Sequence, residues 1–128
     1  EEHLKLKRET GRSYQEKLKG VQGIQLPLEQ TEYAQNLYWV FGLVLDKDVP
    51  WNAQEMMKKM MERNIGCRSF FYPMHLQPVL RKMGLFIGES YPVAENLGER
   101  GFYIPSGLGL TEEQRGYIAE QIRDCIRQ

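Results

Sequence analysis

Residues 36–45, with the sequence NLYWVFGLVL, restrict the possible folds of this chain more than any other segment. They are rich in aromatic and β-branched side chains, which favour a β-strand. Because the segment is almost continuously apolar, we expect a central strand that is covered on both faces. The run from Leu37 to Leu45 is far shorter than the roughly 18 apolar residues that suggest a membrane span. The chain is therefore expected to fold around this strand.

Shorter patterns predict the other elements. Alternating apolar residues that end near a proline or a loop predict three further strands, at 23–27, 65–70 and 101–105. Apolar residues at helical spacing predict five helices, at 3–19, 52–64, 78–84, 91–100 and 111–127. The order is helix, strand, strand, helix, strand, helix, helix, strand, helix. It indicates an α+β fold, in which a small sheet packs against helices.

Two of the expected helices begin at capping boxes, Asn52 with Glu55 and Thr111 with Gln114. A methionine cluster can mark an adaptable binding face, but at this spacing we interpret it as core. It consists of Met56, Met57, Met60 and Met61.

The helix at 3–19 has few apolar positions, and Gly11 lies in its middle. The apolar stripe of this helix is too narrow for a helix buried in a small core, so we expect the helix to pack against something outside this chain. The chain also opens on Glu1, inside the helical pattern, which predicts that it is part of a longer polypeptide.

Composition excludes several functions. The 128 residues fit one domain, and 17 basic and 17 acidic residues give a net charge of zero. Such a balance predicts no nucleic-acid or anionic-membrane partner. Cys67 and Cys125 lack the spacing and histidine partners of a zinc site, so no metal is expected. Two thiols in a chain without a signal peptide indicate a cytoplasmic location.

Residues 68–78 concentrate functional groups around two prolines, Pro73 and Pro78, where neither a strand nor a helix explains them. A proline-fixed loop at a strand end is a common place for binding groups. Arg68 can pair in a bidentate manner with a carboxylate or phosphate. Phe71 and Tyr72 can form an apolar wall for a sugar or base, and His75 with Gln77 can supply hydrogen bonds.

A structural interpretation of the same loop remains open. Phe70 and Phe71 would then anchor it into the core, and Arg68 would form an ion pair with no functional role. Residue types alone do not decide between the two interpretations.

The segment RSFFYPMHLQPV, which begins at Arg68, resembles a signature of the DegT/DnrJ/StrS-type sugar-nucleotide aminotransferases, in the fold-type-I aspartate-aminotransferase superfamily. Within the family, the chain most resembles the branch that is similar to GDP-perosamine synthase. The segments at 36–45, 60–71 and 91–114 are similar to the family in the same order. The resemblance runs from about residue 3 to residue 127.

The resemblance implies a small, mostly antiparallel sheet of three to four strands packed against helices. Residues 1–20 would be the end of an interdomain helix, and residues 21–128 the small C-terminal domain. Such enzymes act as homodimers in polysaccharide biosynthesis. They carry an amino group, usually from glutamate, through PLP and PMP to a keto sugar nucleotide. The small domain closes over the site.

None of the lysines has the sequence context of the family's Schiff-base lysine, so the PLP-binding large domain would be absent. We therefore expect this chain to bind no cofactor and to be inactive alone. By position in the motifs, the resemblance places a set of side chains near the sugar nucleotide, with Arg68 and His75 foremost. The set is Asn36, Tyr38, Trp39, Arg68, Phe71, Tyr72, His75 and Gln77.

Two other functions remain open. The chain could be a free-standing, non-catalytic module, derived from that domain, that binds a ligand or a protein through residues 68–78. It could also be a small enzyme with His75 as general base, although no nucleophile or metal site accompanies it. An isolated small domain is expected to expose an apolar patch near residues 68–78 and the first helix.

Overall fold

The computed structural model describes residues 1–127, so Gln128, the last residue of the expected domain, lies outside the described residues. The elements follow the predicted order, with one short 3-10 turn (η1) added. The helices are α1 (Glu2–Leu18), α2 (Ala53–Met61), η1 (Met74–Leu76), α3 (Pro78–Lys82), α4 (Pro92–Arg100) and α5 (Glu112–Arg127). The strands are β1 (Ile24–Gln25), β2 (Phe41–Leu45), β3 (Arg68–Ser69) and β4 (Gly101–Ile104).

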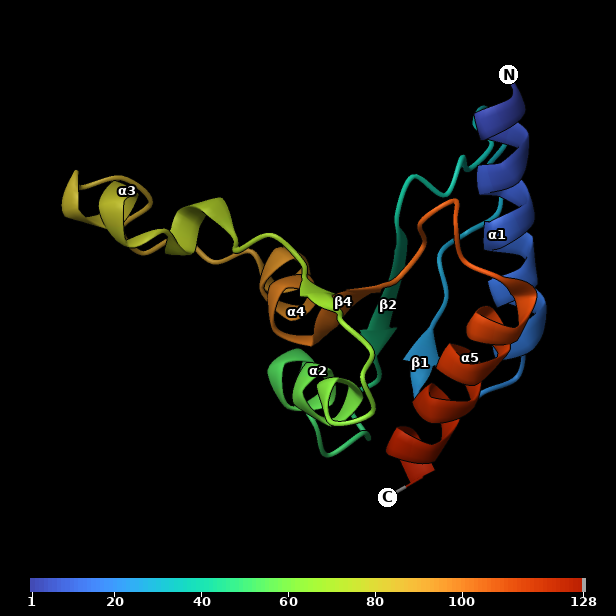
Figure 1. Cartoon of the computed structure of the whole chain (residues 1–128). Helices are drawn as coiled ribbons and strands as arrows, with labels where there is room; N and C mark the ends of the chain where they lie inside the picture. Colours follow the sequence, from blue (N-terminus) through green and yellow to red (C-terminus); the bar gives the residue numbers. More distant parts are fainter. Residues whose placement is uncertain (128) are drawn as a thin grey trace.

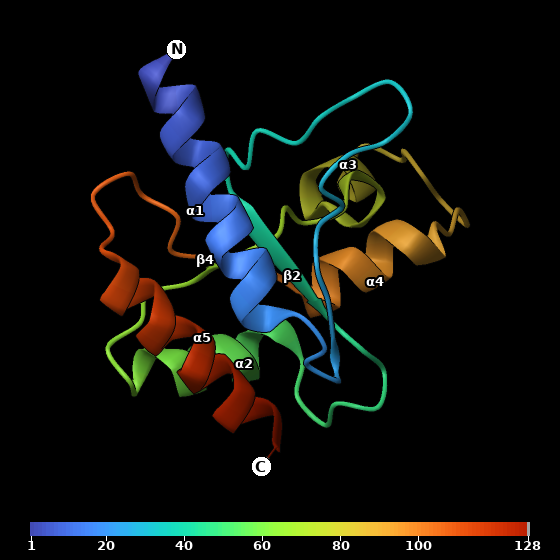
Figure 2. The same ribbon diagram turned by 90° about the vertical axis from the view of Figure 1, so that its right-hand side faces the viewer.

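The strands form one antiparallel sheet in the order β1-β2-β4-β3. This confirms the predicted α+β fold. Figure 1 shows α1 and α5 on one side of the sheet, while the segment that carries α3 extends away on the other. In Figure 2, α1 crosses in front of β2. No helix within residues 1–127 has both the length and the apolar character needed to cross a bilayer.

The inner face of the sheet is the core. Phe41 and Leu43 of β2 lie opposite Ile104 and Phe102 of β4, and these side chains are buried. Helices cover this face with buried side chains of their own: Tyr14, Leu18, Met56, Met60, Ile118 and Ile122. The core interpretation of the methionines is thus confirmed for Met56 and Met60, whereas Met61 is exposed.

The strand predicted at 36–45 is half as long as expected, because only residues 41–45 are extended. Tyr38 has a positive φ of 50°, and its backbone N–H donates to Asn36 Oδ1 (2.7 Å), so a turn replaces the first half. The expectation that both faces are covered is also wrong in part. Gly42 and Val44, on the outer face, are only half-buried.

The helix predicted at 3–19 is confirmed almost to the residue, and its two halves differ. Thr10, Gly11, Tyr14 and Leu18 are buried, whereas Leu4 and other residues of the first turns are exposed. Packing explains why a glycine occupies position 11 in the middle of this helix, because a Cβ there would lie 2.1 Å from Cγ of Tyr38. Both predicted capping boxes form, Asn52 with Glu55 and Thr111 with Gln114.

Candidate functional site

An aromatic platform lies on the outer face of the sheet. The ring of Phe70 packs over Gly42 of β2 and Gly101 of β4, where added Cβ atoms would approach it to 2.9 and 2.4 Å. It also stacks on Tyr103, with 4.5 Å between ring centroids and 26° between the planes. The absence of side chains at the two glycines therefore makes room for Phe70. Phe70 thus anchors the start of the loop on the outer face of the sheet and not in the core, and Phe71 is exposed, so the structural interpretation of residues 68–78 is wrong in both details.

Beside this platform is a shallow groove, which we call the outer groove. It measures about 390 Å³ and is mainly apolar. Trp39 stands at its rim with 73% of its surface exposed. The lining residues come from the end of β1 and the chain after it, from the turn before β2, from β2 itself and from the residue after β3: Gln25, Leu26, Pro27, Leu28, Asn36, Trp39, Val40, Gly42, Val44 and Phe70.

The three candidates at 36–39 take different positions. Asn36 donates from Nδ2 to the carbonyl of Leu28 (2.9 Å) and accepts from the N–H of Tyr38, so its amide holds the turn. Tyr38 turns into the core, where its ring stacks on Phe41 at 5.8 Å. Burial raises the pKa of Tyr38. Trp39 is therefore the member whose side chain is free to meet a ligand.

The segment 71–91, which we call the arm, projects from the rest of the molecule (Figure 1). Phe71 is 81% exposed at its base, and Tyr72 is also exposed. Arg68 precedes the arm on the edge strand β3 with an exposed side chain. No ion pair within residues 1–127 involves Arg68, so the structural ion pair considered for it does not form.

His75 is only 4% exposed and fixes the arm. Its Nε2 lies 2.8 Å from Oε1 of Glu95 on α4, and its ring meets Tyr91 edge-on at 4.9 Å. The same Glu95 oxygen accepts from the N–H of Tyr91 (2.8 Å) and from Ser90 Oγ (3.2 Å). These hydrogen bonds lower the pKa of Glu95. The bond from the Tyr91 N–H has the largest effect, and the bond with His75 the next largest. Glu95 thus joins the outgoing and returning ends of the arm.

Gln77 is also used inside the arm, where its Nε2 donates to the carbonyl of Tyr72 (3.2 Å). Arg81 donates to the carbonyl of His75 (3.1 Å). Neither Glu95 nor Arg81 was singled out from the sequence. The one available signal was the position of Glu95 in the first turn of a helix opened by Pro92, where a carboxylate can accept backbone N–H groups.

The candidates therefore form two sets. Asn36 and Trp39 line the outer groove, whereas Phe71, Tyr72, His75 and Gln77 lie on the arm, with Arg68 at its base. In Figure 1 the tip of the arm is far from the groove strand β2. One chain alone does not assemble the full set around one ligand.

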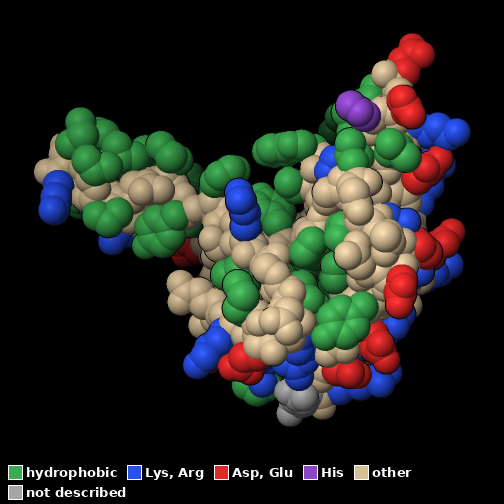
Figure 3. All heavy atoms as spheres, in the orientation of Figure 1, with side chains coloured by type: hydrophobic (Ala, Val, Ile, Leu, Met, Phe, Trp, Pro, Cys, Tyr) green, Lys and Arg blue, Asp and Glu red, His purple; other side chains and the backbone are tan. Residues whose placement is uncertain are grey.

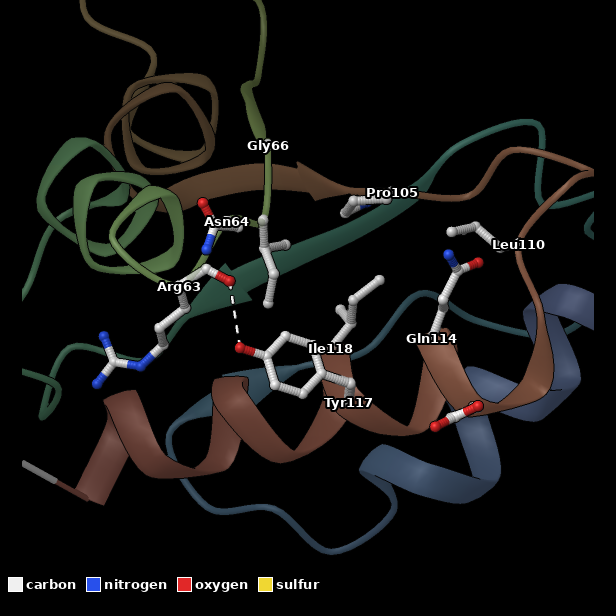
Figure 4. Close-up of a pocket in the computed structure, with 10 residues that line it drawn as sticks. Arg63, Asn64, Gly66, Pro105, Leu110, Gln114, Tyr117 and Ile118 are labelled. Atoms are coloured by element: carbon white, nitrogen blue, oxygen red, sulfur yellow. Dashed lines mark hydrogen bonds between the residues drawn. The ribbon is translucent and has the colours of Figure 1, made fainter.

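A second cavity, of about 520 Å³, lies between the end of α2, the end of β4 and α5 (Figure 4). Tyr117 reaches across it and donates to the carbonyl of Arg63 (3.2 Å). Gln114, on its wall, is used by the Thr111 capping box. No candidate from the sequence lines this cavity, and no group of three or more metal-ligating side chains occurs within residues 1–127.

PLP needs a free lysine amine and a partner for its ring nitrogen, and three of the described lysines have their amines engaged within the chain. Lys7 is half-buried, and burial lowers its pKa. However, its Nζ donates to the carbonyls of Trp39 (2.9 Å) and Ser106 (2.6 Å). Lys17 is paired with Glu112, and Lys59 lies over the ring of Trp51. The other lysines are exposed at the surface: Lys5, Lys19, Lys47, Lys58 and Lys82.

Solved structures similar to this chain include sugar aminotransferases. The Helicobacter pylori aminotransferase PseC, involved in the biosynthesis of pseudoaminic acid, matches with a TM-score of 0.84 at 13% identity, over 97% of this chain and 33% of that one. The candidate sugar aminotransferase Spr1654 from Streptococcus pneumoniae, in its PLP form, matches with a TM-score of 0.86 at 16% identity, over 97% and 31%. The fold is thus one found in sugar aminotransferases.

The sequence identifies the family. The sequence model of the DegT/DnrJ/EryC1/StrS aminotransferase family matches residues 1–123, and the chain belongs to this family. GDP-perosamine synthase of Vibrio cholerae is 25% identical over 127 residues, which are 97% of this chain and 32% of that protein. The chain thus spans about a third of the length of this relative. The family resemblance inferred from the 68–79 motif is confirmed.

Proposed function

We propose that this chain is the small C-terminal domain of a PLP-dependent sugar-nucleotide aminotransferase. The observation that carries the proposal is that nearly the whole chain matches about a third of an enzyme that makes a sugar nucleotide. The exposed first half of α1 and the exposed apolar residues of the groove and arm support it, because these surfaces fit burial against a larger domain. The sequence predicted an apolar patch near residues 68–78 and the first helix, which are two of these surfaces.

In this proposal, the cofactor is held by a part of the enzyme that corresponds to the uncovered length of the relatives. When bound, PLP would accept an amino group, with glutamate as the proposed donor, and pass it to a keto sugar nucleotide. The enzyme would be a homodimer. We place it in the cytoplasm, since both cysteines are free thiols.

The residues of this chain would bind and orient the sugar nucleotide. Trp39 and Phe71 have exposed aromatic faces that suit a sugar or base. Arg68 has a free guanidinium that suits a diphosphate. His75 would act by holding the arm, because its Nε2 is engaged by Glu95.

The test uses the intact natural gene product. We expect it to show the absorbance of lysine-bound PLP, and borohydride reduction should abolish this band and fix the cofactor to a lysine outside residues 1–128. A natural product that consists of these residues alone and binds no PLP would contradict the proposal. In that case, binding of a sugar nucleotide that Arg68→Ala weakens would favour the free-standing module.

A further inference from the structure

Lys7 joins three segments that are distant from one another in the sequence. It lies on α1, and its Nζ donates to the carbonyl of Trp39 (2.9 Å), just before β2, and to the carbonyl of Ser106 (2.6 Å), just after β4. The pairing of β2 with β4 stops one residue before Pro105, which has no N–H to extend it. Lys7 therefore connects the two strands at the point where their backbone pairing ends.

The charge of Lys7 carries a desolvation penalty in this position. The side chain is half-buried, and burial lowers the pKa of its amine. No ion pair within residues 1–127 gives it a carboxylate to offset the penalty. An apolar side chain of similar length would fill the same space without this penalty. What the lysine adds is the pair of hydrogen bonds from a charged donor, which are stronger than bonds between neutral groups.

Trp39 has few other contacts that fix its direction. Its side chain is 73% exposed at the rim of the outer groove, and within residues 1–127 its indole takes part in no hydrogen bond or ring stacking. Figure 3 shows hydrophobic side chains exposed between the arm and α1. The residue before Trp39, Tyr38, packs against Gly11, one helical turn after Lys7. Thus α1 holds this turn at two points, and Lys7 provides the one at Trp39.

We propose that Lys7 is the positioning residue for Trp39, and that it sets the direction in which this indole meets a ligand at the outer groove. A ring held in place before binding loses less conformational freedom when the ligand arrives. In an enzyme where α1 leads to a larger domain, the same hydrogen bonds also transmit the position of that helix to the groove. Only this last consequence, together with a sugar nucleotide as the ligand, rests on the proposed function.

The experiment follows the mobility of the Trp39 indole by time-resolved fluorescence anisotropy. The chain has two tryptophans, so Trp51→Phe leaves Trp39 as the single reporter. In this background, Lys7→Met keeps an unbranched side chain of similar length but donates no hydrogen bond. It should raise the amplitude of the sub-nanosecond indole motion about twofold. Lys7→Arg should restore most of the parent value, because a guanidinium has enough donors for both carbonyls.

Two controls separate positioning from a general loss of structure. Lys5→Met removes another lysine of α1, whose side chain is 79% exposed and paired with Glu9, and it should leave Trp39 unchanged. The second control exchanges the reporter, because Trp39→Phe leaves only Trp51, just before α2. Lys7→Met should not change the motion of Trp51. Circular dichroism confirms that each variant is folded.

Three results would each overturn the proposal: a Trp39 motion that Lys7→Met leaves unchanged, an equal increase at both tryptophans, or a Lys7→Arg variant that restores nothing. If Lys7→Met does not fold, Lys7→Gln takes its place with the same expected increase, because it removes the charge and shortens the side chain. The measurement needs neither PLP nor a substrate. Its failure would therefore leave the proposed aminotransferase function untouched.

Discussion

The arm (residues 71–91) and the rest of the described chain (residues 1–70 and 92–127, here the body) are stabilised by different forces. The body buries the inner face of its sheet completely, with Phe41, Leu43 and Phe102 fully inaccessible to solvent. The arm leaves its large apolar side chains in solvent and is held mainly by the hydrogen bonds around Glu95. Apolar burial therefore determines the structure of the body, whereas a few polar contacts determine the position of the arm.

The sharpest test of this difference replaces one phenylalanine in each region. Phe102→Ala, in the core, should lower the free energy of unfolding by about 3–5 kcal/mol, because it removes apolar contacts and leaves a cavity. Phe71→Ala, at the exposed base of the arm, should change it by less than about 0.5 kcal/mol. Urea denaturation of both variants measures the effect. Equal losses would contradict the division into body and arm.

A second test uses glycines in two helices of the body. Gly11→Ala should destabilise the chain by about 1–3 kcal/mol, because the new Cβ would lie 2.1 Å from the Tyr38 ring and force it to move. Gly116→Ala in α5 meets no atom within 4 Å. It should stabilise the chain by about 0.5–1 kcal/mol through helix propensity. Thermal unfolding of the two variants should therefore shift in opposite directions.

A smaller effect is expected from pH, at the contact between α1 and α5. Glu112 accepts hydrogen bonds from Lys17 (2.5 Å), Arg115 (2.8 Å) and Ser13 (3.0 Å). Together they lower the pKa of Glu112 to about 2, and the bond from Lys17 has the largest effect. Its contribution to stability is present above the pKa of the unfolded chain, about 4.3, and is lost as pH falls towards 2. The urea midpoint should therefore fall over this range, and less so in Glu112→Gln. Glu113→Gln is the matched control.

The smallest effect on global stability is expected from the arm contacts. Glu95→Ala removes the acceptor shared by His75, Tyr91 and Ser90, so the arm should open more often while the body stays folded. Hydrogen exchange should accelerate several-fold in residues 74–90, with no change in β2 and β4. An equal acceleration in the two strands would show that the arm and the body unfold together.

The same difference explains what the sequence could predict. The order of the elements, both capping boxes and the buried Met56 and Met60 follow from apolar spacing and local hydrogen bonds, which are properties of short segments. The turn at Tyr38 could not be predicted, because its aromatic and β-branched neighbours favour a strand. It exists because the ring of Tyr38 packs over Gly11, a residue far away in the sequence.

In the candidate site, too, the sequence could not predict contacts between separate segments. The sequence drew attention to residues 68–78 and to Trp39. Trp39, Phe71 and Tyr72 are exposed, whereas His75 is buried. The spacing could not show that His75 meets Glu95, or that Phe70 fills the space over Gly42 and Gly101, because these contacts join separate segments. Which of these residues touch a substrate stays a prediction.

The attachment of α1 has a mechanical consequence. Its second half is fastened to the body by Tyr14, which donates to the carbonyl of Pro105 (2.7 Å), and by the pair of Lys17 with Glu112. Its first turn is exposed, and Lys7 links the first half to the body through the carbonyls of Trp39 and Ser106. In an enzyme built as proposed, α1 would act as a rigid lever. The pivot would lie at or before its first turns, and the sheet and arm would swing as one piece when the site closes.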